Sequence, residues 1–169
     1  MDNLQLIKNK IYFDWKEEAS HLSTLSFRLS RWREQGLKMV FTNGCFDILH
    51  RGHVEYLSKA SDMGDVLIVG LNTDGSVHRL KGEGRPINNQ EARALVLASL
   101  SFVDAVVLFD EDTPYELIKA VRPDVLVKGA DYKPSEIVGY DIVTSYGGKV
   151  ETVPLVEGYS TTSIISKTR

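Results

Sequence analysis

Five short apolar runs, separated by stretches with helical character, constrain the fold of this chain more than any other feature of its sequence. The runs are LKMVFT, DVLIVGLN, DAVVLF, DVLVKG and KVETVPL, at residues 37–42, 65–72, 104–109, 124–129 and 149–155. They are apolar almost throughout instead of alternating with polar residues, which is the pattern of strands covered on both faces. Strands that alternate with helices favour a parallel sheet with helices on both faces. We therefore expect an α/β fold with a doubly wound sheet of five parallel strands.

The stretches between these runs carry helix signals. Thr113 can cap a helix that has Pro114 in its first position, and Glu116 completes a capping box. Pro123 then ends that helix. We expect a Rossmann-like arrangement with strand order 3-2-1-4-5, in which ligands bind beyond the carboxyl ends of the strands. The other expected helices cover residues 50–60, 88–100 and 137–146 and begin again after residue 160.

Residues 1–36 differ from the rest of the chain, and we expect them to form an N-terminal helical extension before a domain at 37–169. Leu22, Leu25, Leu29 and Trp32 follow a 3-4-3 spacing, which places them on one helical face. Gly36 is a good helix stop. This face can pack on the main domain as ordinary core, or it can contact a second subunit, and the sequence leaves both readings open.

Composition excludes several classes of protein. The net charge of −3 argues against a global basic field for nucleic acid. The single cysteine excludes an internal disulfide and a multi-cysteine zinc site. We find no apolar run of membrane-spanning length and no signal sequence. We therefore expect a soluble, cytoplasmic protein that binds neither nucleic acid nor membrane.

The stretch TNGCFDILHRGH follows the first apolar run, at residues 42–53. Gly44 allows backbone to approach a ligand, and the start of the following helix can hold phosphate. His50 and His53 are three residues apart, so they share one helix face and can donate hydrogen bonds to a phosphate in transfer. A metal site is the weaker interpretation because no third ligand is evident. Cys45 is better explained as a small buried side chain than as a nucleophile.

Two further strand ends carry charged residues. The stretch NTDGSVHRLKGEGRP follows the second run, and its cations Arg79, Lys81 and Arg85 indicate either a solvated loop or a mobile loop that brings charge to a polyphosphate. Arg93, on the next helix, can face solvent or the site. Lys128 ends the fourth run within KGADY, where a lysine can face either solvent or a ligand.

Three hydroxyl residues, Ser160, Thr161 and Thr162, open the last expected helix. One hydroxyl suffices for a helix cap, so three in a row suggest an anion site, although an ordinary cap is the simpler alternative. Other phosphate motifs are missing from the sequence. No GxGxxG follows the first run, and neither GxxxxGK[ST] nor GxSxG occurs, which argues against a dinucleotide fingerprint, a P-loop and a nucleophile elbow.

GCFDILHRGH together with STTSII resembles the signature pair of the HxGH nucleotidyltransferase superfamily. The runs RLKGEGRPIN, EDTP, DVLVKGADYKPSEIVG and GYSTTSII extend the match over residues 36–169. They resemble the adenylyltransferase domain of the bacterial ADP-heptose synthase family, here expected as a stand-alone form without the sugar kinase found in many relatives. Leu155 stands where glycerol-3-phosphate cytidylyltransferase-like enzymes carry Arg, which argues against the cytidylyltransferase alternative.

The resemblance implies an adenylyltransferase that converts ATP and D-glycero-β-D-manno-heptose 1-phosphate to ADP-heptose and pyrophosphate, for lipopolysaccharide core or a related glycan. The alternative is a cytidylyltransferase acting on glycerol phosphate or another small phosphate acceptor. A module that has lost its activity is a third reading, which retention of the motifs disfavours. The resemblance also implies Mg²⁺ bound mainly through the ATP phosphates, no metal site made by the protein, and a homo-oligomer, with a dimer favoured.

The family's functional residues carry over onto matching positions of this sequence. His50, His53 and Lys81 are the expected catalytic residues. The expected nucleotide-binding residues are Thr42, Asn43, Gly44, Cys45, Phe46, Gly52, Arg85, Lys128, Gly129, Ser160, Thr161 and Thr162. The expected substrate-binding residues are Asp47, Asn72, Asp74, Arg93 and Asp131.

Overall fold

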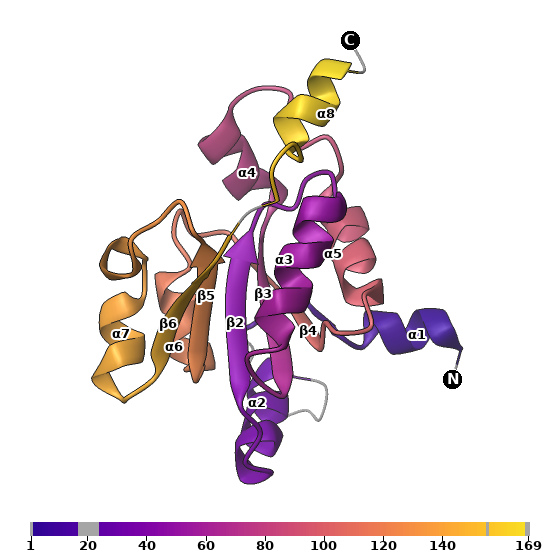
Figure 1. The fold of residues 1–169 in the computed structure, drawn as a ribbon. Helices are drawn as coiled ribbons and strands as arrows, with labels where there is room; N and C mark the ends of the chain where they lie inside the picture. The colour runs from indigo at the N-terminus through magenta and orange to yellow at the C-terminus, as the bar shows by residue number, and fades with distance from the viewer. Residues whose placement is uncertain (1, 17–23, 155, 168–169) are drawn as a thin grey trace.

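The computed structural model describes residues 2–16, 24–154 and 156–167, and its centre is a parallel sheet of six strands (Figure 1). The strand order is β1-β4-β3-β2-β5-β6, and every pair of neighbours is parallel. The strands are β1 (Ile11–Tyr12), β2 (Met39–Gly44), β3 (Val66–Asn72), β4 (Ala105–Phe109), β5 (Val125–Gly129) and β6 (Lys149–Val153). The expected order of five strands is confirmed for β2 to β6, and the expected count is corrected by the additional edge strand β1.

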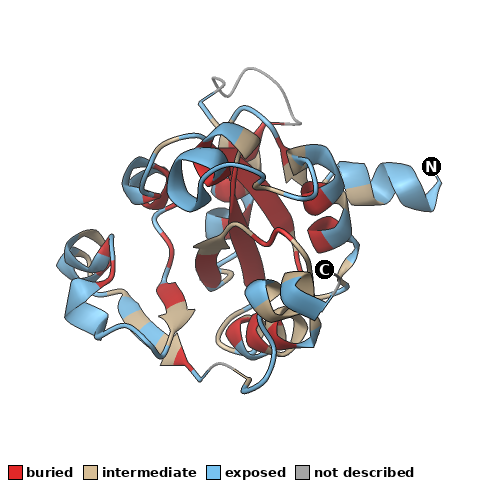
Figure 2. Ribbon diagram, turned by 90° about the horizontal axis from the view of Figure 1, so that it is seen from above, coloured by how far each residue is buried: buried red, intermediate tan, exposed pale blue. Residues whose placement is uncertain are grey.

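Helices cover both faces of this sheet, so the doubly wound architecture is confirmed. One apolar cluster joins the sheet to α2, α6 and α7, and a second joins its other face to α3 and α5. Figure 2 shows the buried strands enclosed by the helices. No helix within the described ranges is long and apolar enough to cross a bilayer. The helices are α1 (Asn3–Lys8), α2 (Leu25–Glu34), α3 (Arg51–Ser61), α4 (Asp74–Lys81), α5 (Gln90–Ser99), α6 (Tyr115–Val121), η1 (Pro134–Glu136), α7 (Tyr140–Ser145) and α8 (Thr161–Lys167).

The N-terminal segment is more than a helical extension. Ile11 in β1 pairs with Val106 in β4, so this segment adds a strand to the sheet edge. Leu25, Leu29 and Trp32 are buried in the cluster shared with the sheet, which supports the core-packing reading for these residues. Leu22 lies outside the described residues. The domain boundary at residue 36 and a contact with a second subunit stay predictions.

Two local expectations are wrong. Residues 74–81 form α4 instead of the expected loop, solvated or mobile, and Thr73 caps this helix by accepting a hydrogen bond from the Ser76 N–H. The expected capping box at Thr113 does not form, since α6 begins at Tyr115 and Pro114 occupies its N-cap position. The helix ends at Val121, and its C-cap residue Arg122, whose φ of 47° is left-handed, directly precedes the proline expected to stop it.

A crevice opens between β2 and β5, where the direction of strand succession reverses. Only Val40↔Val125 and Phe41↔Leu126 are paired between these strands. Beyond these pairs, Tyr56 from α3 is hydrogen-bonded to both strands. Its hydroxyl lies 2.8 Å from the Thr42 hydroxyl and donates to the Val127 carbonyl at 3.1 Å. This reversal point is where ligands bind in open α/β sheets.

Burial of α2 against the sheet predicts that the N-terminal segment stabilises the whole fold. Leu29→Ala should lower the free energy of unfolding by about 2–5 kcal/mol, the usual range for a leucine truncated in a packed core. Chemical denaturation followed by circular dichroism measures this change. Leu6→Ala, at an exposed position of α1, is the matched control and should change stability little. A Leu29→Ala chain as stable as the parent would show that α2 is not part of the common core.

Candidate active site

A cavity of about 610 Å³ lies at the carboxyl edge of the sheet, where the loops after β2, β3, β4, β5 and β6 meet. Figure 1 shows α4 and α8 at this end, beyond the tip of the β2 arrow. Most residues expected from the sequence line this cavity, and three do not: Thr42, Asp74 and Arg93. The expected residues that line it are Asn43, Gly44, Cys45, Phe46, Asp47, His50, Gly52, His53, Asn72, Lys81, Arg85, Lys128, Gly129, Asp131, Ser160, Thr161 and Thr162.

The two histidines form a stacked pair at the start of α3. Their ring centroids are 3.8 Å apart and their planes differ by 22°. Gly52 between them leaves room for this packing, because a Cβ there would lie 3.1 Å from the His50 ring and 3.2 Å from Tyr159 Cβ. Phe46, held at a φ of 42°, meets the His53 ring edge-on at 5.2 Å. The glycine therefore lets the His50 ring and the segment before α8 pack closely against the start of α3.

The environment of the pair favours neutral imidazoles. Burial lowers the pKa of His53 to about 4, helped by the neighbouring His50 and opposed by a hydrogen bond with the Ile48 backbone. Burial also lowers the pKa of His50. The Nδ1 atoms of both rings are buried and have no hydrogen-bond partner among the described residues. Buried polar atoms normally have partners, so this pair is suited to a ligand that supplies them.

Arg93 and Asp74, expected to bind substrate, do not line the cavity, and they are paired with each other. The guanidinium of Arg93 is fully buried and donates to the carbonyls of Cys45 at 2.7 Å and Asn72 at 2.8 Å. It also donates to the Asn88 carbonyl at 3.0 Å. Its remaining partner is the Asp74 carboxylate, at 2.7 Å. Arg93 thus fastens together the segments around the cavity.

Asp47 lines the cavity, but its carboxylate is already occupied. Arg85 Nε donates to one carboxylate oxygen at 2.6 Å. The backbone N–H groups of Ile87 and Asn88 donate to the other at 2.8 and 3.0 Å. Burial raises the pKa of Asp47, but these hydrogen bonds and the arginine charge outweigh it, so the net pKa is lowered. Asp47 therefore holds the loop that carries Arg85, and its contact with substrate stays a prediction.

Lys81 is the last residue of α4, and it lines the cavity. Arg79 on the same helix anchors it to the loop after β4, through ion pairs with Asp110 and with Asp112 at 3.0 Å. Thr73, the N-cap residue, also donates a hydrogen bond to Asp110. Lys81 is consequently presented by a fixed helix and not by a free loop.

The other side of the cavity comes from the ends of β5 and β6. Lys128 Nζ donates to the Asn43 carbonyl at 3.3 Å. Ser160 caps α8, because its hydroxyl accepts from the Ser163 N–H at 3.0 Å. Thr161 and Thr162 line the cavity beside Ser160. Because one hydroxyl suffices for the helix cap, these two hydroxyl groups are available for another role.

Two expectations about the first strand end change in detail. Cys45 is only half buried and lines the cavity, and burial raises the pKa of its thiol, so it is a poor nucleophile. Thr42 is fully buried and pairs with Tyr56, so it supports the crevice and does not reach a ligand.

Sequence reasoning missed several lining residues. Asp112 and Pro114 follow β4, and the rule that ligands bind after strands would have found them. Tyr56 lies three residues beyond His53 and so follows it on the same helix face. Leu80, Tyr132 and Tyr159 carry no separate signal, because each is simply adjacent to an expected residue, and no motif singles out Val156.

The carboxylates of the described residues that line the cavity do not form a metal-binding cluster. No group of three or more His, Cys, Asp or Glu side chains suited to a metal ion occurs within residues 2–16, 24–154 and 156–167. Asp47 is committed to Arg85 and to two backbone donors, and Asp112 to Arg79. This donor set fits a magnesium ion that keeps most of its ligands from water and phosphate.

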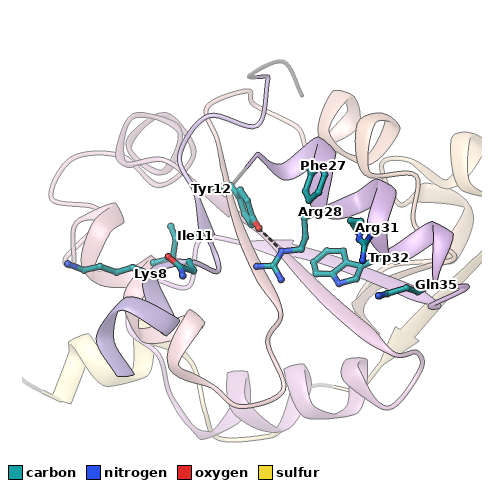
Figure 3. Close-up of a pocket in the computed structure, with 9 residues that line it drawn as sticks. Lys8, Ile11, Tyr12, Phe27, Arg28, Arg31, Trp32 and Gln35 are labelled. Carbon is teal, nitrogen blue, oxygen red and sulfur yellow. Dashed lines mark hydrogen bonds between the residues drawn. The ribbon is translucent and has the colours of Figure 1, made fainter. Parts of the chain in front are cut away.

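A second cavity, of about 620 Å³, lies between β1 and α2 (Figure 3). Arg28 crosses it, donating to the Tyr12 hydroxyl at 3.2 Å and lying over the Trp32 ring. None of the residues expected from the sequence to bind or react lines this cavity, so it is separate from the candidate site.

Comparisons with known proteins identify similar chains. The family described as cytidylyltransferase-like matches residues 41–167. The chain is 61% identical over 137 residues to the "Bifunctional protein HldE" of Wolinella succinogenes, covering 81% of this chain and 28% of that protein. It is 63% identical over 136 residues to the protein of the same name from Caulobacter vibrioides, covering 80% and 28%. The chain thus spans well under a third of the length of these relatives.

A solved structure has the same fold. It is described as a lipopolysaccharide core biosynthesis protein from Thermoplasma volcanium. Its sequence is 30% identical, its TM-score is 0.60, and the match covers 74% of this chain and 100% of that one.

The lowered histidine pKa values give a direct test of the geometry. Because burial disfavours the imidazolium, His53 should stay neutral as the pH falls through its usual value of 6.5 and should charge only near pH 4. Proton NMR of the imidazole C2–H across a pH titration, assigned with a His53→Gln variant, measures this. A His53 that titrates near 6.5 would show that the pair is open to water.

Proposed function

The chain belongs to the cytidylyltransferase-like family of nucleotidyltransferases, and on that premise we propose that it transfers the adenylyl group of ATP to D-glycero-β-D-manno-heptose 1-phosphate. The products are ADP-heptose and pyrophosphate, for lipopolysaccharide core or a related glycan. The observation that carries the proposal is that His50, His53 and the triplet Ser160–Thr162, distant in sequence, line one cavity.

The choice of sugar rests on motifs and relatives. The run LVKGADYKPSEIVG resembles the enzymes that make ADP-heptose, and the similar solved structure is described as acting in lipopolysaccharide core biosynthesis. These relatives are described as bifunctional, but the chain spans only 28% of their length. We therefore propose only the adenylyltransferase activity for it. Leu155, which argued against a cytidylyltransferase, lies outside the described residues.

The reaction is an in-line displacement at the α-phosphorus of ATP. A phosphate oxygen of the sugar 1-phosphate forms the new O–P bond, and the bond from the α-phosphorus to the bridging oxygen breaks. Pyrophosphate leaves with that electron pair. The attacking oxygen is already anionic, so no general base is needed, and catalysis consists of positioning and charge stabilisation.

The histidine pair and Lys81 supply the stabilisation in this proposal. A neutral imidazole keeps one N–H, so His50 and His53 can each donate to phosphate oxygens without a net charge in the empty site. As negative charge accumulates in the transition state, these donors gain strength. Lys81 adds a full positive charge from α4. Thr161 and Thr162 donate hydroxyl hydrogen bonds to the triphosphate.

Magnesium enters this proposal with the nucleotide. When bound, it neutralises phosphate charge and fixes the triphosphate conformation. The chain's own residues then orient the acceptor and the α-phosphate. Asp47 and Arg93 hold the surrounding loops at their fixed spacing, through the hydrogen bonds described above.

Pyrophosphate release, measured across four nucleoside triphosphates and a panel of phosphorylated acceptors, tests the proposed substrates. The proposal expects ATP with the β-anomer of the heptose 1-phosphate to have the highest kcat/KM. Preference for CTP and glycerol phosphate would contradict it and favour the cytidylyltransferase alternative. Tight ATP binding without pyrophosphate release from any pair would instead indicate a binding module.

The histidine pair gives the sharpest mutational test. His50→Ala and His53→Ala should each lower kcat by a factor of about 10² to 10³, the scale of losing one transition-state donor. His78→Ala is the matched control, since His78 is exposed on α4 and does not line the cavity. Steady-state kinetics with saturating ATP measures the change. Near-normal turnover of either variant would overturn the assignment.

A further inference from the structure

We propose that Lys128, Asn43, Asp131 and Tyr132 form the acceptor subsite, in which Lys128 binds the phosphate of the sugar phosphate and the other three contact its sugar. This inference rests on the proposed function, and it reassigns Lys128 and Asn43 from the nucleotide to the acceptor. All four residues line the main cavity.

The position of Lys128 in the sheet supports this assignment. It lies near the carboxyl end of β5, and Asn43 lies near that of β2, on opposite sides of the crevice where pairing stops after Phe41↔Leu126. Tyr56 occupies the deeper part of that gap. The ammonium group therefore enters the cavity from its floor, between the two strands.

Two polar groups at this floor have unused hydrogen-bonding capacity. Among residues 2–16, 24–154 and 156–167, Lys128 Nζ makes one hydrogen bond, of 3.3 Å to the Asn43 carbonyl, although an ammonium group has three donors. The side-chain oxygen of Asn43 is buried and has no hydrogen-bond partner in the described part of the chain. A ligand that offers both anionic oxygens and hydroxyl donors satisfies both groups.

The residues beside Lys128 match a sugar. Asp131 places a carboxylate in the cavity, and carboxylate oxygens accept hydrogen bonds from hydroxyl groups. The Tyr132 side chain is 54% exposed, and it lines the cavity with an aromatic ring that can pack on the apolar face of a pyranose. A cation, a carboxylate and an exposed ring within five residues fit a phosphorylated polyol better than a triphosphate.

In-line transfer requires the entering and leaving oxygens to lie on opposite sides of the phosphorus. The histidine pair enters the cavity from α3 and the hydroxyl triplet from α8, and Gly52 and Tyr159 pack these two segments against each other. Lys128 enters from a different element, β5. If the leaving pyrophosphate lies beside α3 and α8, the acceptor phosphate must lie on the opposite side, beside β5.

The protonation of Lys128 supplies an independent readout. Burial lowers the pKa of its ammonium group to about 8, and the nearby Asp131 and Cys45 oppose this shift. A bound phosphate dianion favours the ammonium form and raises the pKa again. At a pH of about 8 the empty site holds a mixture of both forms, so acceptor binding takes up a fraction of a proton.

Lys128→Met tests the subsite, with Lys133→Met as the matched control, because Lys133 is exposed and does not line the cavity. Lys128→Met should raise KM for the sugar 1-phosphate by about 10-fold or more, the effect of losing a charge-assisted hydrogen bond. The affinity for ATP with Mg²⁺, measured by calorimetry without acceptor, should stay unchanged. Calorimetry of acceptor binding in buffers of different ionisation enthalpy should show proton uptake in the parent protein and none in Lys128→Met.

Tyr132→Ala provides a second variant at an exposed position, should the partly buried lysine be needed for folding, and it should raise the acceptor KM while leaving ATP affinity intact. Loss of ATP affinity in Lys128→Met with an unchanged acceptor KM would overturn the subsite. A parent protein that prefers another phosphorylated acceptor would contradict the proposed function alone. The same two variants, measured with that acceptor, would still decide whether Lys128 binds its phosphate.

Discussion

The buried guanidinium of Arg93 is the interaction on which the arrangement of the cavity depends. It ties the end of β2 to the end of β3 through the carbonyls of Cys45 and Asn72. It also holds the start of α4 through Asp74 and the loop before α5 through Asn88. A buried charge is tolerated only when its hydrogen bonds are satisfied, so these four segments must keep this relative placement. Because Asp74 and Lys81 are the first and last residues of α4, the contact between Arg93 and Asp74 also helps to position Lys81.

The sheet could be predicted from the sequence because its signal is local. β3 and β4 are buried at every residue, and their apolar runs report this directly. β1 could not be predicted, since two residues carry no periodicity and its pairing with β4 depends on distant chain. α4 was missed because it is short and buries only Ser76 and Val77, so its apolar face is too narrow to stand out.

The candidate site divides in the same way. Residues at or shortly after the carboxyl ends of strands, such as Lys128 and His50, could be placed from topology, because parallel strands end at one edge. The roles of Arg93 and Asp47 could not, since several of their partners are distant backbone groups: the Cys45 carbonyl lies 48 positions from Arg93, and the Ile87 N–H lies 40 positions from Asp47. A charged residue near a site has the same sequence signature whether it contacts the ligand or holds the loop that does.

A crystal structure of the chain with Mg²⁺ and a non-hydrolysable ATP analogue tests the central claim most directly. We expect the α- and β-phosphates to lie against the His50 and His53 rings, and the β- and γ-phosphates to lie at Thr161 and Thr162. Lys128 should then remain free to take the acceptor. A nucleotide bound between β1 and α2, at Arg28 and Trp32, or a triphosphate that contacts neither histidine, would contradict it.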